Sequence, residues 1–389
     1  MEYVNTLTVA TDWLLINGHS PSDDLSKVGD DKSLLLLSSF TDCPINVKML
    51  LRKGVNPDVT DEDGFTPLML ACYTGATSVV RELLRAQADV TIVNKYRDTA
   101  LTIAVRRKRK QIVTLLLNPS RCSQSQGLSP VLVATACGYR KILKKLIRAK
   151  LDLNQQDECG RTPLMLAIDK SHSLLTLLHS GADQNIRDID GNTPLMLAIA
   201  MNKPKVVWEL LRHPLTEVEG WNKEGVTPLI LATRVANSEV IRYLLEAGAN
   251  PNATSATGET PLMSAVISGY PQVVRLLLAY EADPNVREKA GDTALSLAIR
   301  TGNAQIVHEV MVGDINPCVL RATLLDAVTK KNLTAIMTLL GYVTYPQDVN
   351  QCLKMESSLL IRTYLYAYLF ARRIEVGVRN TIDSLFSKH

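Results

Sequence analysis

Cysteine and histidine, the side chains most often found at catalytic and metal sites, are few and scattered in this sequence. The chain has seven cysteines and six histidines among 389 residues. No two cysteines have the C-x-x-C spacing, and no histidine pairs with a cysteine or glutamate at a spacing typical of metal ligands. We therefore predict free thiols in a reducing interior, no metal site and no cofactor.

One pair of residues has the side-chain types that many hydrolases use in catalysis. Asp169 and His172 lie three residues apart, in a copy of the repeat described below whose second helix we expect to be short. No serine nucleophile is expected beside this pair, and the chain contains no G-x-x-x-x-G-K-[ST] phosphate-binding loop. The sequence therefore predicts that the protein is not an enzyme.

Basic residues give a stronger chemical signal. Residues 94–156 contain 14 Lys and Arg and few acidic residues, whereas the whole chain has a formal net charge of only +4. The remainder of the chain is therefore net negative. We expect the following residues to form one basic patch: Arg106, Arg107, Lys108, Arg109, Lys110, Arg140, Lys141, Lys144, Lys145 and Arg148.

The role of this patch stays open between several alternatives. One alternative is a contact surface for an acidic partner segment, a phosphopeptide or nucleic acid. Another is a nuclear-import signal in Arg106–Lys110, and the third is an ordinary solvated face. Tyr96 and Tyr139 are its only aromatic residues, which makes sequence-specific RNA reading unfavourable.

The composition excludes several classes of protein. Hydrophobic residues make up 46% and charged residues 21%, which is not typical of a disordered chain. No run of eighteen apolar residues is present, so we expect no membrane span. Residues 1–12 lack the features of a secretory signal, and we expect a cytoplasmic or nuclear protein, or one found in both places.

A Thr-Pro-Leu tripeptide recurs along the chain and indicates the elements that hold these residues. Clear copies begin at Thr66, Thr162, Thr193, Thr227 and Thr260, and degenerate copies begin at Thr99, Ser129 and Thr293. A glycine stands two residues before all but one of these positions, where Arg97 replaces it. A near-constant period of this length is typical of stacked repeats.

Each copy predicts a pair of helices. Threonine is a good N-cap, and proline fits the first helical turn because no N–H is needed there. Gly75 ends the first helix in one copy, and a Val-Val-x-x-Leu-Leu stripe such as residues 79–84 follows in the second helix. A Gly-Ala-Asn turn such as residues 248–250 then leads to the next copy.

The recurring sequence pattern resembles the ankyrin repeat over residues 28–345. The resemblance implies an all-α solenoid of stacked helix-turn-helix units with hairpin loops, with about ten repeats including divergent caps. We expect a truncated cap at 1–27 and a C-terminal helical cap at 346–389. The histidine typical of the fourth position of the tetrapeptide is replaced by methionine in four copies, and we expect these side chains to fill the core: Met69, Met165, Met196 and Met263.

The resemblance also implies where a partner binds, because ankyrin partners contact hairpin tips and the concave helix face. The matching positions are Phe65, Tyr73, Lys95, Arg106, Ile189, Trp221, Lys223 and Arg234. Phe65, Tyr73, Ile189 and Trp221 should face solvent, unless Trp221 folds back over the loop at 213–220. We predict a monomeric, non-enzymatic scaffold or adaptor for another protein. The alternative is a nuclear or nucleic-acid/phosphate-associated binder that uses the basic patch of residues 94–156.

Overall fold

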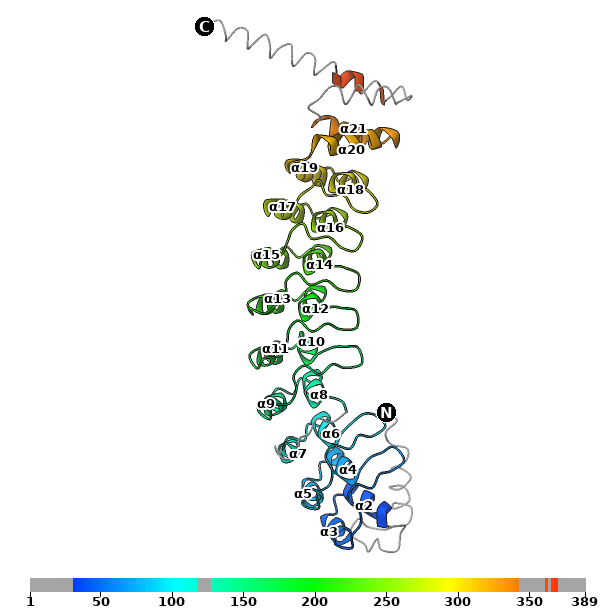
Figure 1. Cartoon of the computed structure of the whole chain (residues 1–389), viewed down its shortest axis with the longest axis vertical. Helices are drawn as coiled ribbons and strands as arrows, with labels where there is room; N and C mark the ends of the chain where they lie inside the picture. The colour runs from blue at the N-terminus through cyan, green and yellow to red at the C-terminus, as the bar shows by residue number, and fades with distance from the viewer. Residues whose placement is uncertain (1–30, 118–126, 343–360, 363–364, 370–389) are drawn as a thin grey trace. The chain divides into compact units, whose positions relative to one another are not determined.

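The computed structural model describes residues 31–117, 127–342, 361–362 and 365–369, and these residues form helices, turns and loops without a strand. The chain divides into two compact units, residues 1–189 and 190–389. Within each unit, pairs of short helices stack in chain order (Figure 1). An all-α repeat solenoid is therefore the correct fold class, and the total of about ten repeats stays a prediction.

Unit 1 consists of helix pairs joined by short turns. Its helices are α2 (Asp31–Phe40), α3 (Pro44–Arg52), α4 (Pro67–Thr74), α5 (Thr77–Arg85), α6 (Ala100–Arg106), α7 (Lys110–Leu116), α8 (Pro130–Ala136), α9 (Arg140–Arg148), α10 (Pro163–Leu166) and α11 (Ser171–Leu178).

Unit 2 repeats the same plan. Its helices are α12 (Pro194–Ala200), α13 (Pro204–Leu211), α14 (Pro228–Val235), α15 (Ser238–Glu246), α16 (Pro261–Ser268), α17 (Pro271–Ala279), α18 (Ala294–Thr301), α19 (Ala304–Val312), α20 (Pro317–Thr329) and α21 (Leu333–Leu340). The predicted cap at 1–27 lies outside the described residues, and of the predicted cap at 346–389 only residues 361–362 and 365–369 are described, as helix.

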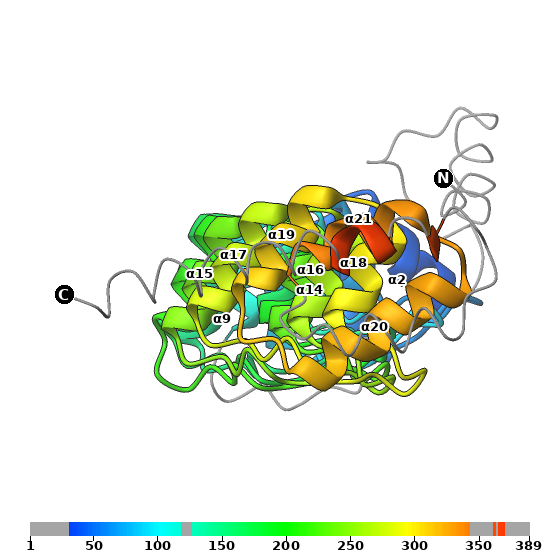
Figure 2. The same ribbon diagram turned by 90° about the horizontal axis from the view of Figure 1, so that it is seen from above.

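The first helices of the pairs form one row in each unit and the second helices form another. In unit 1, α4, α6 and α8 contact one another in succession, and so do α5, α7 and α9. Unit 2 has the same arrangement, and Figure 2 shows its loops gathered along one edge. We call the two rows the first-helix row and the second-helix row.

The threonine caps form as predicted. The Thr66 hydroxyl accepts a hydrogen bond from the Met69 amide at 3.2 Å, and Pro67 follows as the first helical residue. In α6 and α18 alanine replaces this proline, and a capping box is present instead. There the Thr102 hydroxyl accepts from the Thr99 amide at 2.7 Å. The repeat therefore starts its first helix in two chemically different ways.

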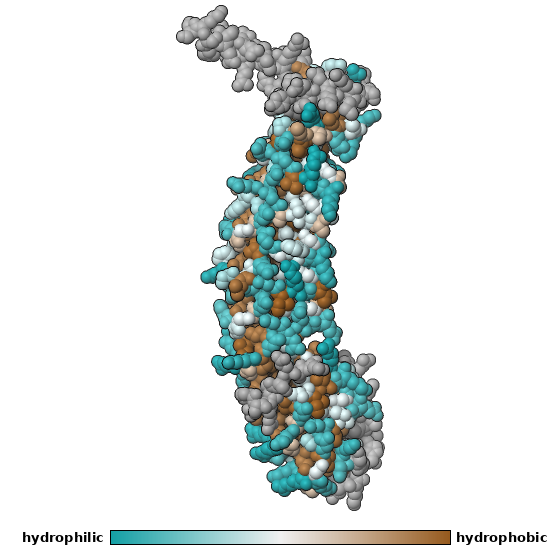
Figure 3. Space-filling view, in the orientation of Figure 1, coloured by the Kyte–Doolittle hydropathy of each residue, from teal (hydrophilic) through white to brown (hydrophobic). Residues whose placement is uncertain are grey.

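The core consists of small and medium aliphatic side chains together with methionine. Met69, Met165, Met196 and Met263 are at most 4% exposed, so the prediction that they fill the core is confirmed. In the second-helix row the stripe of α5 is likewise buried, from Val79 to Leu84 on one face. Hydrophilic residues cover much of the surface drawn in Figure 3, with apolar side chains between them.

Several hairpins are hydrogen-bonded to the hairpin of a neighbouring repeat. In unit 1 the Ile189 amide donates to the Cys159 carbonyl at 3.1 Å. A Cβ added at Gly160, whose φ is +72°, would lie 2.7 Å from the Ile189 amide nitrogen, so the hairpins stack this closely only with glycine there. In unit 2 the Asn252 side-chain oxygen accepts from the Asp283 amide at 2.7 Å.

The same amide bridge recurs one repeat later in unit 2. There the Asn285 side-chain oxygen accepts from the Asn316 amide, again at 2.7 Å. In these two places a side chain of one repeat therefore holds the backbone of the next repeat.

Candidate partner-binding pocket

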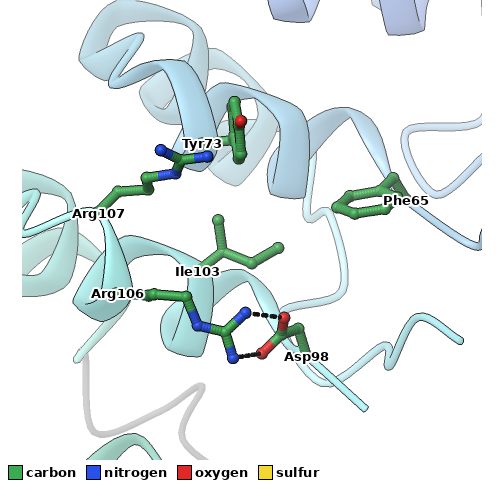
Figure 4. Close-up of a pocket in the computed structure, with 6 residues that line it drawn as sticks. All are labelled: Phe65, Tyr73, Asp98, Ile103, Arg106 and Arg107. Carbon is green, nitrogen blue, oxygen red and sulfur yellow. Dashed lines mark hydrogen bonds and ion pairs between the residues drawn. The ribbon is translucent and has the colours of Figure 1, made fainter. Parts of the chain in front are cut away.

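A small pocket lies between two successive repeats of unit 1, at α4 and α6 (Figure 4). Its lining residues are Phe65, Tyr73, Asp98, Ile103, Arg106 and Arg107. Three of the eight predicted partner-binding residues are among them: Phe65, Tyr73 and Arg106. The pocket therefore brings together residues from two copies of the repeat.

The repeat itself positions these side chains. Phe65 directly precedes the N-cap threonine of α4, and Asp98 directly precedes that of α6. Tyr73 lies near the end of α4, and Arg106 is the last residue of α6. Since the two helices pack side by side, the start and the end of neighbouring first helices face one pocket.

Arg106 forms an ion pair within the fold. Its guanidinium donates two hydrogen bonds to the Asp98 carboxylate, at 2.6 and 2.8 Å. The Asp98 side chain is 2% exposed and that of Arg106 is 40% exposed. Such a bidentate pair fixes both groups, so most of the charge of Arg106 is neutralised locally.

Arg107 is the cation that remains available in the pocket. Its guanidinium carbon lies 3.7 Å from the centre of the Tyr73 ring, a cation–π contact. Arg107 is exposed and forms no ion pair with any described residue. Figure 4 shows it pointing toward Tyr73, with Ile103 between this contact and the Arg106–Asp98 pair. The pocket thus joins an apolar surface with an unneutralised planar cation.

The prediction that Phe65 faces solvent is wrong. Phe65 is only 9% exposed, because its ring packs 6.1 Å from that of Tyr96 in the next hairpin. Tyr73 is half-buried. Ile189 and Trp221 are 52% and 64% exposed, as expected.

The other predicted contact residues are spread over both units. Lys95 is exposed in a hairpin of unit 1, and Lys223 is exposed in a hairpin of unit 2. Arg234 in α14 forms an ion pair with Glu259 at 2.7 Å. The structure brings none of these three to the pocket of Figure 4, and their binding role stays a prediction.

Sequence reasoning missed Asp98 and Ile103 as pocket residues and assigned Arg107 to the basic patch alone. A signal for Asp98 was present. Aspartate stands eight residues before arginine in two copies, as Asp98 with Arg106 and as Asp292 with Arg300. Both pairs are formed in the structure, so this spacing indicates an ion pair that spans a first helix.

The predicted basic patch divides into two kinds of residue. Arg109 donates to the Thr74 carbonyl at 2.6 Å and thereby caps the end of α4, and Lys145 donates to the Thr114 hydroxyl. Together with Arg106 these residues serve the fold. The remaining ones make no ion pair with the described residues: Arg107, Lys108, Lys110, Arg140, Lys141, Lys144 and Arg148.

The described residues contain no cluster of three or more His, Cys, Asp or Glu side chains that could bind a metal ion. Asp169 and His172 are exposed, and the shortened helix of their repeat is the first, the four-residue α10, rather than the second as predicted. Burial raises the pKa of the Cys72 thiol far above its usual value, which makes it unreactive. No helix in the described ranges has the length and apolar character needed to cross a bilayer.

Comparison with known proteins agrees with the resemblance to the ankyrin repeat. The family model for ankyrin repeats (three copies) matches residues 34–126, 131–220, 170–255, 215–288 and 249–319. The chain is 28% identical to the chicken (Gallus gallus) nuclear factor NF-kappa-B p105 subunit over 194 residues, covering 48% of this chain and 17% of that protein. It is 34% identical to mouse (Mus musculus) ankyrin repeat domain-containing protein 63 over 126 residues, covering 30% and 32%.

A solved structure is also similar. An ankyrin repeat domain from Acinetobacter baumannii AYE shares 32% identity, with a TM-score of 0.45, and the match covers 47% of this chain and 96% of that one. The chain spans at most about a third of the length of the two curated relatives.

Proposed function

Because the chain belongs to the ankyrin repeat family, whose repeats are generally protein-interaction modules, we propose that it is a non-enzymatic scaffold or adaptor that binds another protein. The contact surface consists of the pocket of Figure 4 and the exposed hairpin residues around it. The protein acts as a monomer in the cytoplasm, the nucleus or both.

One observation carries this proposal. Tyr73 and Arg107 form an aromatic–guanidinium contact at the edge of a partly apolar pocket, and Arg107 has no acidic partner in the described chain. Aromatic and arginine side chains dominate the energetics of protein interfaces, where truncation often costs about 2 kcal/mol or more. A partner that supplies an apolar side chain together with a carboxylate satisfies both parts of this pocket.

Affinity purification followed by mass spectrometry tests the proposal. We expect Tyr73→Ala or Arg107→Ala to lose partners that the unmodified chain retains. Tyr243→Ala is a matched control, because Tyr243 is also a half-buried tyrosine but belongs to the second-helix row and packs on Trp208. Trp221→Ala tests the exposed hairpin residue of unit 2 separately. Partner sets that are identical for all four variants and the unmodified chain would exclude this surface.

The alternative function, a nucleic-acid or phosphate binder, is favoured by a different observation. Every fully exposed residue of α9 is basic: Arg140, Lys141, Lys144 and Arg148. Binding to nucleic acid by such a face would weaken steeply with salt, with a slope of about −0.9 per phosphate contact on duplex DNA. Retention on heparin or DNA that does not depend on salt, or no retention at low salt, would rule this alternative out.

A further inference from the structure

A second cavity in unit 1 lies at the start of α9 and shares no lining residue with the pocket of Figure 4. It has a volume of about 240 Å³, and its lining residues are Lys108, Lys110, Gly138, Tyr139, Arg140, Lys141 and Ile142. Four of these seven residues are cationic and none is acidic. Lys108 and Lys110 come from the turn between α6 and α7 and from the first residue of α7, and the other lining residues come from the equivalent turn and the start of α9 in the next repeat.

None of the four cations is neutralised by the described residues. Lys110, Arg140 and Lys141 are exposed and make no ion pair there. The Lys108 ammonium lies 5.2 Å from the centre of the Tyr139 ring, a contact that leaves its positive charge in place. Four like charges around one cavity repel one another, so an anion that enters it is attracted by all four at once.

We propose that this cavity binds a phosphoserine or phosphothreonine of a protein partner. A phosphomonoester carries a charge of about −1.5 to −2 at neutral pH and three strong acceptor oxygens. A single carboxylate carries only about half to two thirds of that charge and leaves most of the four cations uncompensated. Arg140 supplies a planar fork for two phosphate oxygens, and the lysines supply point charges.

The surroundings favour a peptide over a nucleic acid or a lipid surface. Single-stranded nucleic acids stack bases on aromatic rings, but Tyr139 is the only ring in the lining and Lys108 already lies over it. The exposed face of α9 carries Lys144 and Arg148 and no fully exposed apolar residue that could enter a bilayer. These two cations extend the charge along the helix, which suits acidic residues that flank a phosphorylated position.

This inference rests on the proposed function, since it assumes a protein partner, but it uses a different surface. The probe is a peptide pool with a fixed central phosphoserine and randomised flanks, and the same pool with serine is the control. Retention of the purified full-length chain on each pool is measured. We expect retention on the phosphorylated pool to exceed that on the serine pool by about tenfold or more. One hydrogen bond to a charged group typically contributes this much to affinity.

Two double variants separate a phosphate site from general attraction. Lys110→Gln with Arg140→Gln removes two cations that line the cavity, and Lys144→Gln with Arg148→Gln removes the same two residue types farther along α9. The first double variant should lose retention on the phosphorylated pool, and the second should keep most of it. Circular dichroism checks that both double variants are folded, which we expect because all four substituted residues are exposed.

Several results would overturn the proposal. Equal losses in the two double variants would show unspecific charge attraction. Tighter binding of a single-stranded oligonucleotide, or of vesicles of phosphatidylcholine and phosphatidylserine, through Lys110 and Arg140 would assign the cavity to a different ligand. Tyr73→Ala should leave retention on the pool unchanged, so a failure of the pocket in Figure 4 and a failure of this cavity are distinguishable.

Discussion

The two aspartate–arginine pairs at equivalent positions of different repeats give a sharp test of how burial sets the strength of an ion pair. Asp98 with Arg106 in unit 1 and Asp292 with Arg300 in unit 2 have the same spacing of eight residues. The Asp98 side chain is 2% exposed, whereas that of Asp292 is 26% exposed. The local structure is the same, because each aspartate directly precedes the N-cap threonine of a first helix that begins with a capping box.

The expected magnitudes follow from the contacts. Loss of Arg106 leaves a buried carboxylate without the two hydrogen bonds that it accepts, and hydrogen bonds to charged groups contribute about 1.5–3 kcal/mol. Arg106 is 40% exposed, so water screens part of the interaction and we expect a coupling of about 1–2 kcal/mol. The pair Asp292–Arg300 has one hydrogen bond of 2.7 Å and is more exposed to solvent, so we expect a coupling of about 0.2–1 kcal/mol.

Double-mutant cycles measure both couplings. The variants are Asp98→Asn, Arg106→Gln and their combination, and the corresponding three at Asp292 and Arg300. The free energy of unfolding is obtained from urea titrations followed by circular dichroism, with the transition of each unit fitted separately and unchanged slopes required. We also expect Arg106→Gln to cost more than Asp98→Asn, because only the former leaves a buried charge unpaired.

A coupling at Asp292–Arg300 equal to or larger than that at Asp98–Arg106 would refute the reasoning. It would mean that spacing along the helix, and not burial of the carboxylate, sets the strength of the pair. Equal costs for the two single variants at the buried pair would contradict the expected penalty for an unpaired buried charge.

The cysteines, the helix caps and one ion pair between repeats can each be tested separately. Cys159 should react with iodoacetamide in the native state and Cys72 only after unfolding, since Cys72 is buried and Cys159 is exposed; peptide mapping by mass spectrometry measures both. Thr260→Ala should lower the free energy of unfolding by about 1 kcal/mol, because the hydroxyl that accepts from Met263 is lost; urea titration measures the change, and Thr260→Ser should restore most of it. Hydrogen bonds from Arg275 hold the pKa of Glu309 below its usual value, so this pair stabilises the fold above the usual glutamate pKa, and the contribution is lost as the pH falls through the lowered one. Melting temperatures of Glu309→Gln should therefore fall less on acidification than those of the unmodified chain, and parallel curves would contradict this.

The sequence predicted the parts of the fold that a single repeat determines. The threonine cap, the proline after it, the end of the first helix and the buried methionines all depend on contacts within one copy. Their chemistry repeats in the sequence with the same period, so the pattern is enough to find them.

The features that the sequence did not predict depend on contacts between copies. Phe65 was expected to be exposed because it matches a hairpin-tip position of the ankyrin pattern, but Tyr96 of the next hairpin packs against it. Arg109 was counted in a free basic patch, yet it reaches back to the carbonyl of Thr74 in the preceding repeat. Neither contact can be derived without the positions of neighbouring repeats.

The amide bridges between repeats of unit 2 have a consequence for how the length of the chain can change. The acceptors Asn252 and Asn285 stand 33 residues apart, and so do the donors Asp283 and Asn316. Deletion of residues 253–285 would therefore place the Asn252 side chain 31 residues before the amide of Asn316, the separation it now has from Asp283. Unit 2 can thus be shortened or extended here by one whole repeat with its bridges intact, whereas a deletion of half that length would leave a donor and an acceptor out of register.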